Sequence, residues 1–134
     1  MIVVFDASSL VGAALGENSI PERALLLAMS EGRTLLLSKA VAGEYLEVLS
    51  RPKFARTISI GRRQQILGII ERFAERVEPG EAIAECRDPG DDKYLALAAA
   101  GGADVIVSSD RDLLEMDRWR GIRVLRPAEF IALA

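Results

Sequence analysis

Short apolar runs alternate with segments of helical periodicity along the whole chain. Runs of the kind that form buried strands cover residues 2–5, 34–37, 105–107 and 122–125, and a further short strand is expected near Val77. Helical spacing is seen over residues 7–15, 21–30, 38–50 and 61–76, and in segments that begin at Asp92 and Pro127. This alternation predicts helices on both faces of a mostly parallel sheet, a three-layer α/β/α fold.

The chain has the size of one domain. Half of its 134 residues are hydrophobic, which supplies one sizeable core, so we predict a single domain over residues 1–134. No apolar run approaches the roughly 20 residues of a membrane span, and the first residues enter a strand without the basic region of a signal peptide. Together with a single cysteine, Cys86, these features predict a cytoplasmic protein with no membrane partner.

The sequence contains no histidine, which excludes several kinds of site. A serine–histidine triad, a histidine general base and the usual His/Cys zinc sites all need an imidazole. Carboxylates remain, and ligand sets made only of oxygen suit hard cations such as Mg²⁺ or Mn²⁺. Any chemistry is therefore expected from aspartate and glutamate.

Four acids come from separate segments that a parallel sheet brings to one edge. Asp6 and Asp110 each follow an apolar run, Asp92 begins an alanine-rich helix, and Glu44 lies on the helix after the second strand. Carboxyl ends of parallel strands meet at the same edge, where α/β proteins bind ligands. Four carboxylates at close range repel one another unless a cation neutralises them. They predict a divalent-metal site able to act on a phosphodiester.

The position of Glu44 depends on the phase of its helix. Val41 and Val48 belong to an apolar stripe, and at about 100° per residue Glu44 lies beside them while Glu47 points away. A half-buried glutamate costs free energy unless it is paired. Glu44 therefore needs either a role in the site or an ion pair.

Charge is segregated along the chain. The net charge of −3 argues weakly against a protein that coats nucleic acid. Residues 48–70, however, hold five bases and no acid, whereas residues 81–92 hold five acids and one base. Solvated surface is the commoner explanation for each base taken singly. The candidate phosphate contacts are Arg51, Lys53, Arg56, Arg62 and Arg63.

The acidic segments resemble a known family. Their order and spacing are similar to those of PIN-domain proteins of the prokaryotic toxin–antitoxin (VapC-like) group, from Ile2 to about Val124. The segments that carry the similarity are residues 4–8, 38–49, 87–95 and 109–112. The resemblance implies a compact α/β/α sandwich and a Mg²⁺- or Mn²⁺-dependent endoribonuclease, often inhibited by an antitoxin encoded beside it.

The resemblance also implies roles for particular residues. Its four acidic positions match Asp6, Glu44, Asp92 and Asp110 as catalytic residues and metal ligands. Additional candidate ligands are Asp91 and Asp112, while Ser8 and Ser109 are expected in the outer shell of the site and Asp88 is expected to be structural. RNA is the implied substrate, with the five bases as its contacts. An antitoxin is the implied protein partner, and a homodimer is a further candidate assembly.

Other phosphate chemistries fit less well. A haloacid-dehalogenase-type phosphatase needs a second acid two residues after the first, where this chain has Ser8. A response-regulator receiver needs a lysine after a late strand, and a nucleotide switch needs a glycine-rich phosphate loop. The alternative that stays open is a catalytically silent PIN-like module that binds RNA or protein. Four intact acids disfavour it, because their repulsion would be uncompensated.

Overall fold

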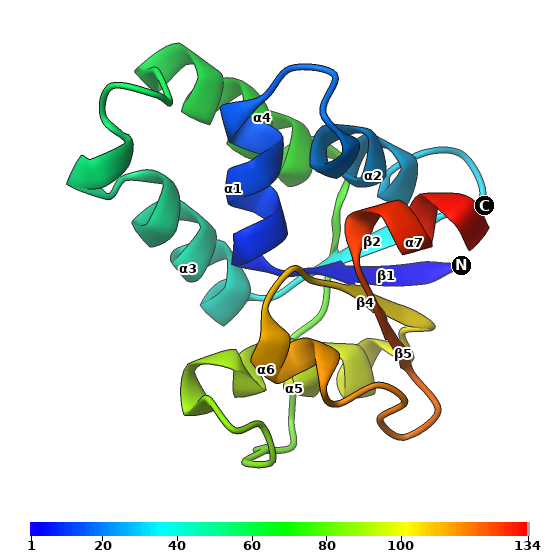
Figure 1. Ribbon diagram of the computed structural model, residues 1–134. Coiled ribbons are helices and arrows are strands. Elements are labelled where there is room, and N and C mark those ends of the chain that lie inside the picture. Colours follow the sequence, from blue (N-terminus) through cyan, green and yellow to red (C-terminus); the bar gives the residue numbers. More distant parts are fainter. Residues whose placement is uncertain (134) are drawn as a thin grey trace.

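A five-stranded parallel sheet lies at the centre of the protein, in the order β3-β2-β1-β4-β5 (Figure 1). The computed structural model describes residues 1–133. The strands are β1 (Ile2–Phe5), β2 (Thr34–Leu37), β3 (Glu75–Arg76), β4 (Val105–Val107) and β5 (Arg123–Leu125). The chain builds outward from β1 to β3 and then returns to β4 on the other side of β1. The strand order therefore reverses between β1 and β4, which is where open α/β sheets bind ligands.

Helices cover both faces of the sheet. In Figure 1, α1, α2 and α7 lie on one face and α5 and α6 on the other, while α3 and α4 pack beside α1. The helices are α1 (Ala7–Leu15), α2 (Ile20–Ala28), α3 (Lys39–Leu49), α4 (Ile60–Phe73), α5 (Asp92–Gly101), α6 (Arg111–Leu114) and α7 (Pro127–Leu133), with the 3₁₀ helices η1 (Pro52–Phe54) and η2 (Pro89–Asp91). The predicted three-layer α/β/α fold is confirmed. Within residues 1–133, no helix is long and apolar enough to cross a membrane.

Capping side chains fix where the first four helices begin. In each case a side-chain oxygen accepts a hydrogen bond from a backbone N–H three residues further on, which satisfies a donor that the first turn leaves free. The caps are Asp6 for α1, Ser19 for α2, Ser38 for α3 and Ser59 for α4. The predicted starts of these helices are therefore correct to within one residue.

The helix predicted for residues 61–76 ends earlier than expected. It stops at Phe73, and Glu75 and Arg76 instead pair with the edge of β2 as strand β3. The apolar spacing that runs on to Phe73 and Val77 suggested a longer helix, but Phe73 is 56% exposed and Val77 donates its N–H to the carbonyl of Leu37. Hydrogen bonding to a free sheet edge overrides the helical pattern here.

The core between the layers holds the carboxyl ends of the strands in place. Val3, Val4 and Phe5 of β1 are fully buried, as expected for a strand covered on both faces. Helix α5 packs so closely on β2 that a Cβ atom at Gly101 would lie 2.2 Å from Leu36 Cδ1. Close packing of this kind leaves the residues at the strand ends little freedom to move.

Arg62 is used inside the fold. Its guanidinium donates to the carbonyl oxygens of Ala13 at 2.8 Å and Ala14 at 3.3 Å, and forms an ion pair with Glu22. Those carbonyls belong to the last turn of α1, where a helix lacks internal partners. The Arg62 and Glu22 side chains are only 15% and 14% exposed. Arg62 therefore joins α1, α2 and α4, and the expectation that it contacts RNA is set aside.

We expect Arg62→Met to lower the free energy of unfolding by about 2–4 kcal/mol, because it leaves Glu22 and two carbonyls without their partner. Urea unfolding followed by circular dichroism measures the change. Arg56→Met is the matched control at an exposed arginine, and we expect a change within about 0.5 kcal/mol. Equal losses in the two variants would show that the Arg62 contacts do not stabilise the fold.

Candidate metal and nucleic-acid site

A cavity of about 520 Å³ lies at the reversal point between β1 and β4. Its lining comes from the residues that follow these strands and from α1, α3, η1, η2 and α5. The lining residues are Asp6, Ala7, Ser8, Val11, Glu44, Val48, Arg51, Lys53, Phe54, Asp88, Gly90, Asp91, Tyr94 and Asp110. Three of the four predicted acids, Asp6, Glu44 and Asp110, are among them, and the fourth, Asp92, is not.

Asp6 is held rigidly at the end of β1. Its carboxylate accepts hydrogen bonds from Ser9 N at 3.0 Å, from Ser108 Oγ at 2.6 Å and from Ser8 Oγ at 2.8 Å. Burial raises the pKa of Asp6, and the hydrogen bonds from Ser108, Ser9 and Ser8 counteract that rise. Asp6 is therefore both the cap of α1 and a charge that the fold orients and compensates.

Ser8 and Ser109 link the ends of β1 and β4. Ser109 donates its backbone N–H to Ser8 Oγ at 3.2 Å, and the Ser109 hydroxyl lies 3.3 Å from that of Ser9. Ser8 also donates its hydroxyl to Asp6, so it connects Ser109 to this acid. The place of both serines in the outer shell of a metal site stays a prediction.

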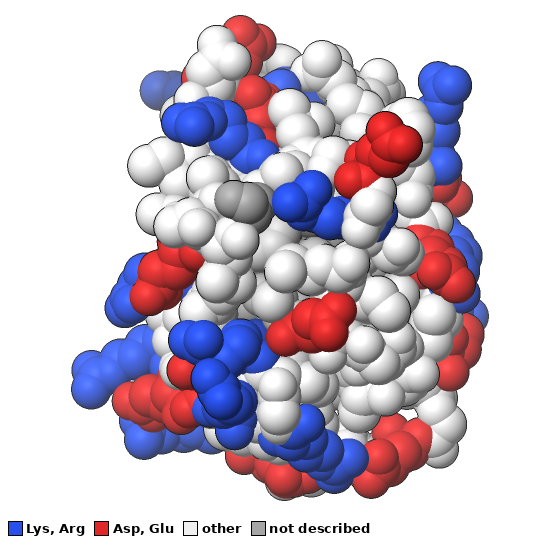
Figure 2. All heavy atoms as spheres, turned by 90° about the vertical axis from the view of Figure 1, so that its right-hand side faces the viewer, with Lys and Arg blue, Asp and Glu red and all other residues white. Residues whose placement is uncertain are grey.

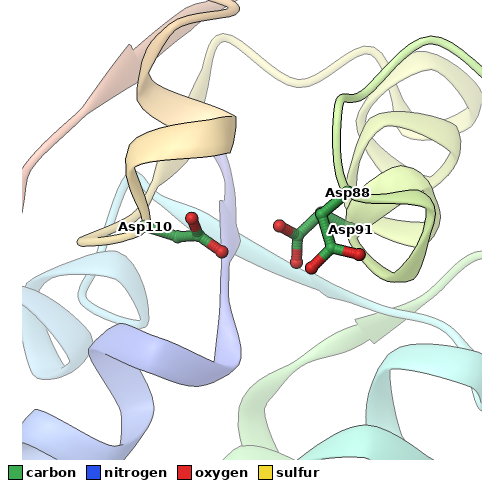
Figure 3. A group of neighbouring side chains, drawn as sticks. All are labelled: Asp88, Asp91 and Asp110. Atoms are coloured by element: carbon green, nitrogen blue, oxygen red, sulfur yellow. The ribbon is translucent and has the colours of Figure 1, made fainter.

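Three aspartates form the tightest acidic cluster found among residues 1–133. Asp88, Asp91 and Asp110 each place a carboxylate oxygen within 4.8 Å of the others. Figure 3 shows that Asp110, just before α6, points across a gap toward Asp88 and Asp91, which come from the turn around η2. Two chain segments far apart in sequence thus converge on one point.

Asp91 is the most buried carboxylate of this cluster. It is only 8% exposed, and its Oδ2 has no hydrogen-bond partner. Burial, the hydrogen bond and charge of Asp110, and the charges of Asp88 and Asp6 together raise the pKa of Asp91 to about 8. A buried carboxylate oxygen without a donor is costly unless a proton or a cation compensates it.

Asp92 faces away from the cavity. Its Oδ1 accepts hydrogen bonds from the backbone N–H groups of Cys86 at 2.8 Å and Glu85 at 3.1 Å, which fixes the linker before η2. Asp91 ends η2 and Asp92 begins α5, so the two side chains leave the backbone in different directions. Asp91, and not Asp92, thus lies in the cavity, and the ligand role expected of Asp92 stays a prediction.

Asp112 and Asp88 also differ in part from expectation. Asp112 is absent from the cavity lining, and its carboxylate lies 3.9 Å from Arg87 at the surface. Asp88 accepts a hydrogen bond from Gly90 N at 2.9 Å, as a structural turn residue would. It also belongs to the acidic cluster, which the sequence interpretation missed. The candidate ligands near Asp110 are thus Asp88 and Asp91.

Glu44 reaches the cavity with two partners from α5. Tyr94 donates its hydroxyl to Glu44 Oε1 at 2.6 Å, and Lys93 forms an ion pair with Oε2. The same Tyr94 hydroxyl accepts from Ala7 N at 3.1 Å, which joins α5 to the start of α1. Glu47, in contrast, is 61% exposed and pairs with Arg51 at 2.9 Å. The helical phase predicted for Glu44 and Glu47 is confirmed.

Lys93 and Tyr94 were missed as site residues by sequence reasoning. The signal in the sequence was Glu44, because a half-buried acid requires a partner. Lys93 and Tyr94 directly follow the acidic turn and could have been considered as its partners. Burial, the Tyr45 hydroxyl and Glu44 all raise the pKa of Tyr94, so its hydroxyl remains a proton donor. Tyr94 can therefore orient Glu44 at any pH at which the protein works.

The structure brings two of the five predicted bases to the cavity. Arg51 and Lys53 line it. Arg56 borders a separate hollow beside Arg62, and Arg63 donates to Ser50 Oγ at 3.2 Å. The positive charge next to the acids thus comes from the end of α3 and from η1.

The gathering of acids is a local feature of one edge. Figure 2 shows the face turned away from the cavity, on the side of both chain ends in Figure 1, where lysines and arginines are interspersed with acids around a broad uncharged area. Mixed charges of this kind are ordinary solvated surface. The edge of the sheet that holds the cavity is different, because several carboxylates lie close together there.

The residues in the cavity fit a divalent cation. Every ligating group in the cluster is a carboxylate, the donor that Mg²⁺ and Mn²⁺ prefer, and Asp91 Oδ2 is a buried acceptor without a donor. Asp88, Asp91 and Asp110 would hold such an ion, with Asp6 and Glu44 in the same cavity. The arrangement can bind a cation and, through it, an anionic substrate.

Comparisons with known proteins identify the family of the chain. A family model described as the PIN domain matches residues 2–112. That match covers well over half of the chain, which therefore belongs to the PIN-domain family, as the sequence resemblance predicts. No curated protein sequence matches the chain.

Two solved structures share the fold. PAE2754 from Pyrobaculum aerophilum is 15% identical, with a TM-score of 0.65 over 99% of this chain and 89% of that one. VapBC2 from Rickettsia felis, crystallised with a DNA fragment from its promoter, is 17% identical, with a TM-score of 0.58 over 92% and 97%. At these identities the likeness confirms the α/β/α architecture.

We expect the metal-free protein to lose stability as pH rises from about 4 to about 8. The pKa of Asp91 is raised in the folded state, to about 8, so its stabilising contribution is complete below the unfolded pKa and is lost as pH approaches the folded one. Urea unfolding in EDTA at pH 5 and pH 8 measures the difference. Asp91→Asn should reduce this pH dependence, because the asparagine does not titrate.

Mg²⁺ serves as the control in that experiment. Because a cation binds the charged carboxylate, Mg²⁺ should restore the stability of the wild-type protein at pH 8 and have little effect on Asp91→Asn. If the free energy of unfolding changed equally with pH in the wild-type protein and in Asp91→Asn, the pKa of Asp91 would not be raised in the folded state.

Proposed function

We propose that the protein is a cytoplasmic, metal-dependent endoribonuclease that hydrolyses RNA phosphodiester bonds, and that it is the toxin of a toxin–antitoxin pair. The observation that carries the proposal is the buried, uncompensated carboxylate of Asp91 within the cluster of Asp88 and Asp110. Such a cluster is costly in a protein with no use for a cation. Membership of the PIN-domain family supports nuclease activity.

Mg²⁺ or Mn²⁺ is the proposed cofactor. When bound, a divalent cation supplies neutralising charge for a phosphodiester and makes a water more acidic for its hydrolysis. Asp6, Glu44, Asp91 and Asp110 are the proposed catalytic acids, with Asp88 at the exposed side of the cluster. Asp91 takes the place that the sequence assigned to Asp92.

The chain's other residues position these acids and the substrate. Lys93 and Tyr94 hold Glu44, and Ser8 holds Asp6. Arg51 and Lys53 line the same cavity, which supports them as contacts for RNA phosphates. Because these charges flank the acids, an anionic backbone can approach the cluster despite the net charge of −3.

An antitoxin is the proposed protein partner. The resemblance to the toxin–antitoxin group supports it, and so does the fold shared with VapBC2. A partner with an acidic segment would cover Arg51 and Lys53 and block access of RNA to the cavity. A silent RNA- or protein-binding module is the competing function, but it offers no reason for an unpartnered Asp91 Oδ2.

Cleavage of single-stranded RNA by the purified protein tests the proposal. We expect Mg²⁺- or Mn²⁺-dependent fragments that disappear with EDTA. Asp110→Asn, Asp91→Asn and Glu44→Gln should each lower the rate at least about 100-fold, since each removes a charge from the cation site. Undiminished cleavage in EDTA would contradict the mechanism.

Two matched controls sharpen this test. Glu47→Gln lies on the same helix as Glu44 but at the surface, and should leave turnover at saturating RNA unchanged within about twofold. Asp92→Asn should keep most of the activity and lower the melting temperature, because Asp92 holds the linker at Glu85 and Cys86. An inactive Asp92→Asn beside an active Asp91→Asn would restore the assignment predicted from sequence.

A further inference from the structure

The cavity has an apolar part beside its acidic part. Val11 of α1, Val48 of α3 and Phe54 of η1 line it together with the acids. Val48 is buried, whereas Val11 and Phe54 are half-buried, packing on the core while they line the cavity. A site that bound only a metal and a phosphate would have no need of this apolar surface.

Phe54 presents its ring from a rigid turn. Its backbone N–H donates to Arg51 O at 3.0 Å, and its carbonyl accepts from Thr57 N at 3.0 Å and Ile58 N at 2.8 Å. Tyr94 is the other aromatic residue in the lining, but it is 1% exposed and its hydroxyl is engaged with Glu44. Phe54 is therefore the aromatic side chain of this lining, within residues 1–133, that keeps ring surface available to a ligand.

Positive charge lies next to this ring. Lys53 Nζ is 5.1 Å from the centre of the Phe54 ring, and Arg51, just before η1, lines the same cavity. A ligand that fits all of these groups needs an anionic part for the bases and the cation site, and a flat apolar part for Phe54. A nucleotide has both, because its phosphate is anionic and its base offers a π face.

We propose that Phe54 forms a nucleobase-stacking subsite, which takes one unpaired nucleotide of single-stranded RNA next to the phosphodiester that the acids address. This inference rests on the proposed function and adds to it a contact for one base of the RNA. A base in a duplex is stacked on its neighbours and does not expose its faces, so the subsite favours single strands over double-stranded RNA. Stacking on an aromatic ring accepts any base, so this subsite selects strand state rather than sequence.

Fluorescence of 2-aminopurine tests the subsite directly. The probe is placed at each position in turn of a short single-stranded RNA and titrated with the full chain carrying Asp110→Asn, so that the RNA remains intact. We expect quenching at one position. Phe54→Leu should remove that quenching and weaken binding about 5- to 100-fold, whereas Phe54→Tyr should retain both. Circular dichroism of each variant establishes that it is folded. If Phe54→Leu does not fold, quenching and binding are compared between Phe54→Tyr and Arg51→Ala instead.

An abasic nucleotide at the quenched position is the matched control on the RNA. It should bind Phe54→Leu and the parent chain equally, because no base is left to stack. Duplex RNA of the same sequence should likewise be insensitive to Phe54→Leu. Undiminished binding and quenching in Phe54→Leu would overturn the subsite, including the case in which this apolar surface receives a protein partner instead.

The fate of the proposed function is read separately, from hydrolysis of the same RNA by the wild-type chain with Mg²⁺. Phe54-dependent quenching without hydrolysis would support the subsite and contradict the nuclease. Hydrolysis without Phe54-dependent quenching would overturn the subsite and leave the nuclease in place.

Discussion

Repulsion between carboxylates dominates the edge of the sheet where β1 and β4 end. Asp6 and Asp91 are almost completely buried there, with Asp88, Asp110 and Glu44 in the same cavity. Charge of one sign in a poorly solvated place favours protonation, unless hydrogen bonds or a cation stabilise the charged form. The fold provides hydrogen bonds for Asp6 and an ion pair for Glu44, but no donor for Asp91 Oδ2. In our interpretation, this edge is a metal site because Asp91 Oδ2 needs a compensating positive charge that the fold does not supply.

The rest of the structure holds the acids against this repulsion. Strand order brings the ends of β1 and β4 together, and the serines at both ends are joined by hydrogen bonds. The Tyr45 hydroxyl donates to the carbonyl of Phe5, and that of Tyr94 connects α1, α3 and α5. These bonds lie within a close-packed core, so the acids cannot move apart to relieve their repulsion. In the interpretation proposed here, this repulsion lowers stability and keeps the acids ready for a cation, as is common at functional sites.

The sequence was most informative where a local rule acts alone. Helix starts followed from capping residues such as Ser38, and the orientation of Glu44 followed from helical phase. The choice between Asp91 and Asp92 could not be made, because it depends on how a 3₁₀ turn joins α5 and on the linker that Asp92 holds. Arg62 could not be assigned either, since its partners lie 40 to 49 residues away in the chain. Long-range contacts of this kind leave no periodic trace.

The position of a bound cation tests this interpretation most directly. Crystals grown with saturating Mn²⁺ and measured at the manganese absorption edge give an anomalous difference map that locates the ion. The predicted result is a peak in contact with the carboxylates of Asp91 and Asp110. A map with no peak in the cavity, or a peak held by Asp92 and Asp112 instead, would contradict it.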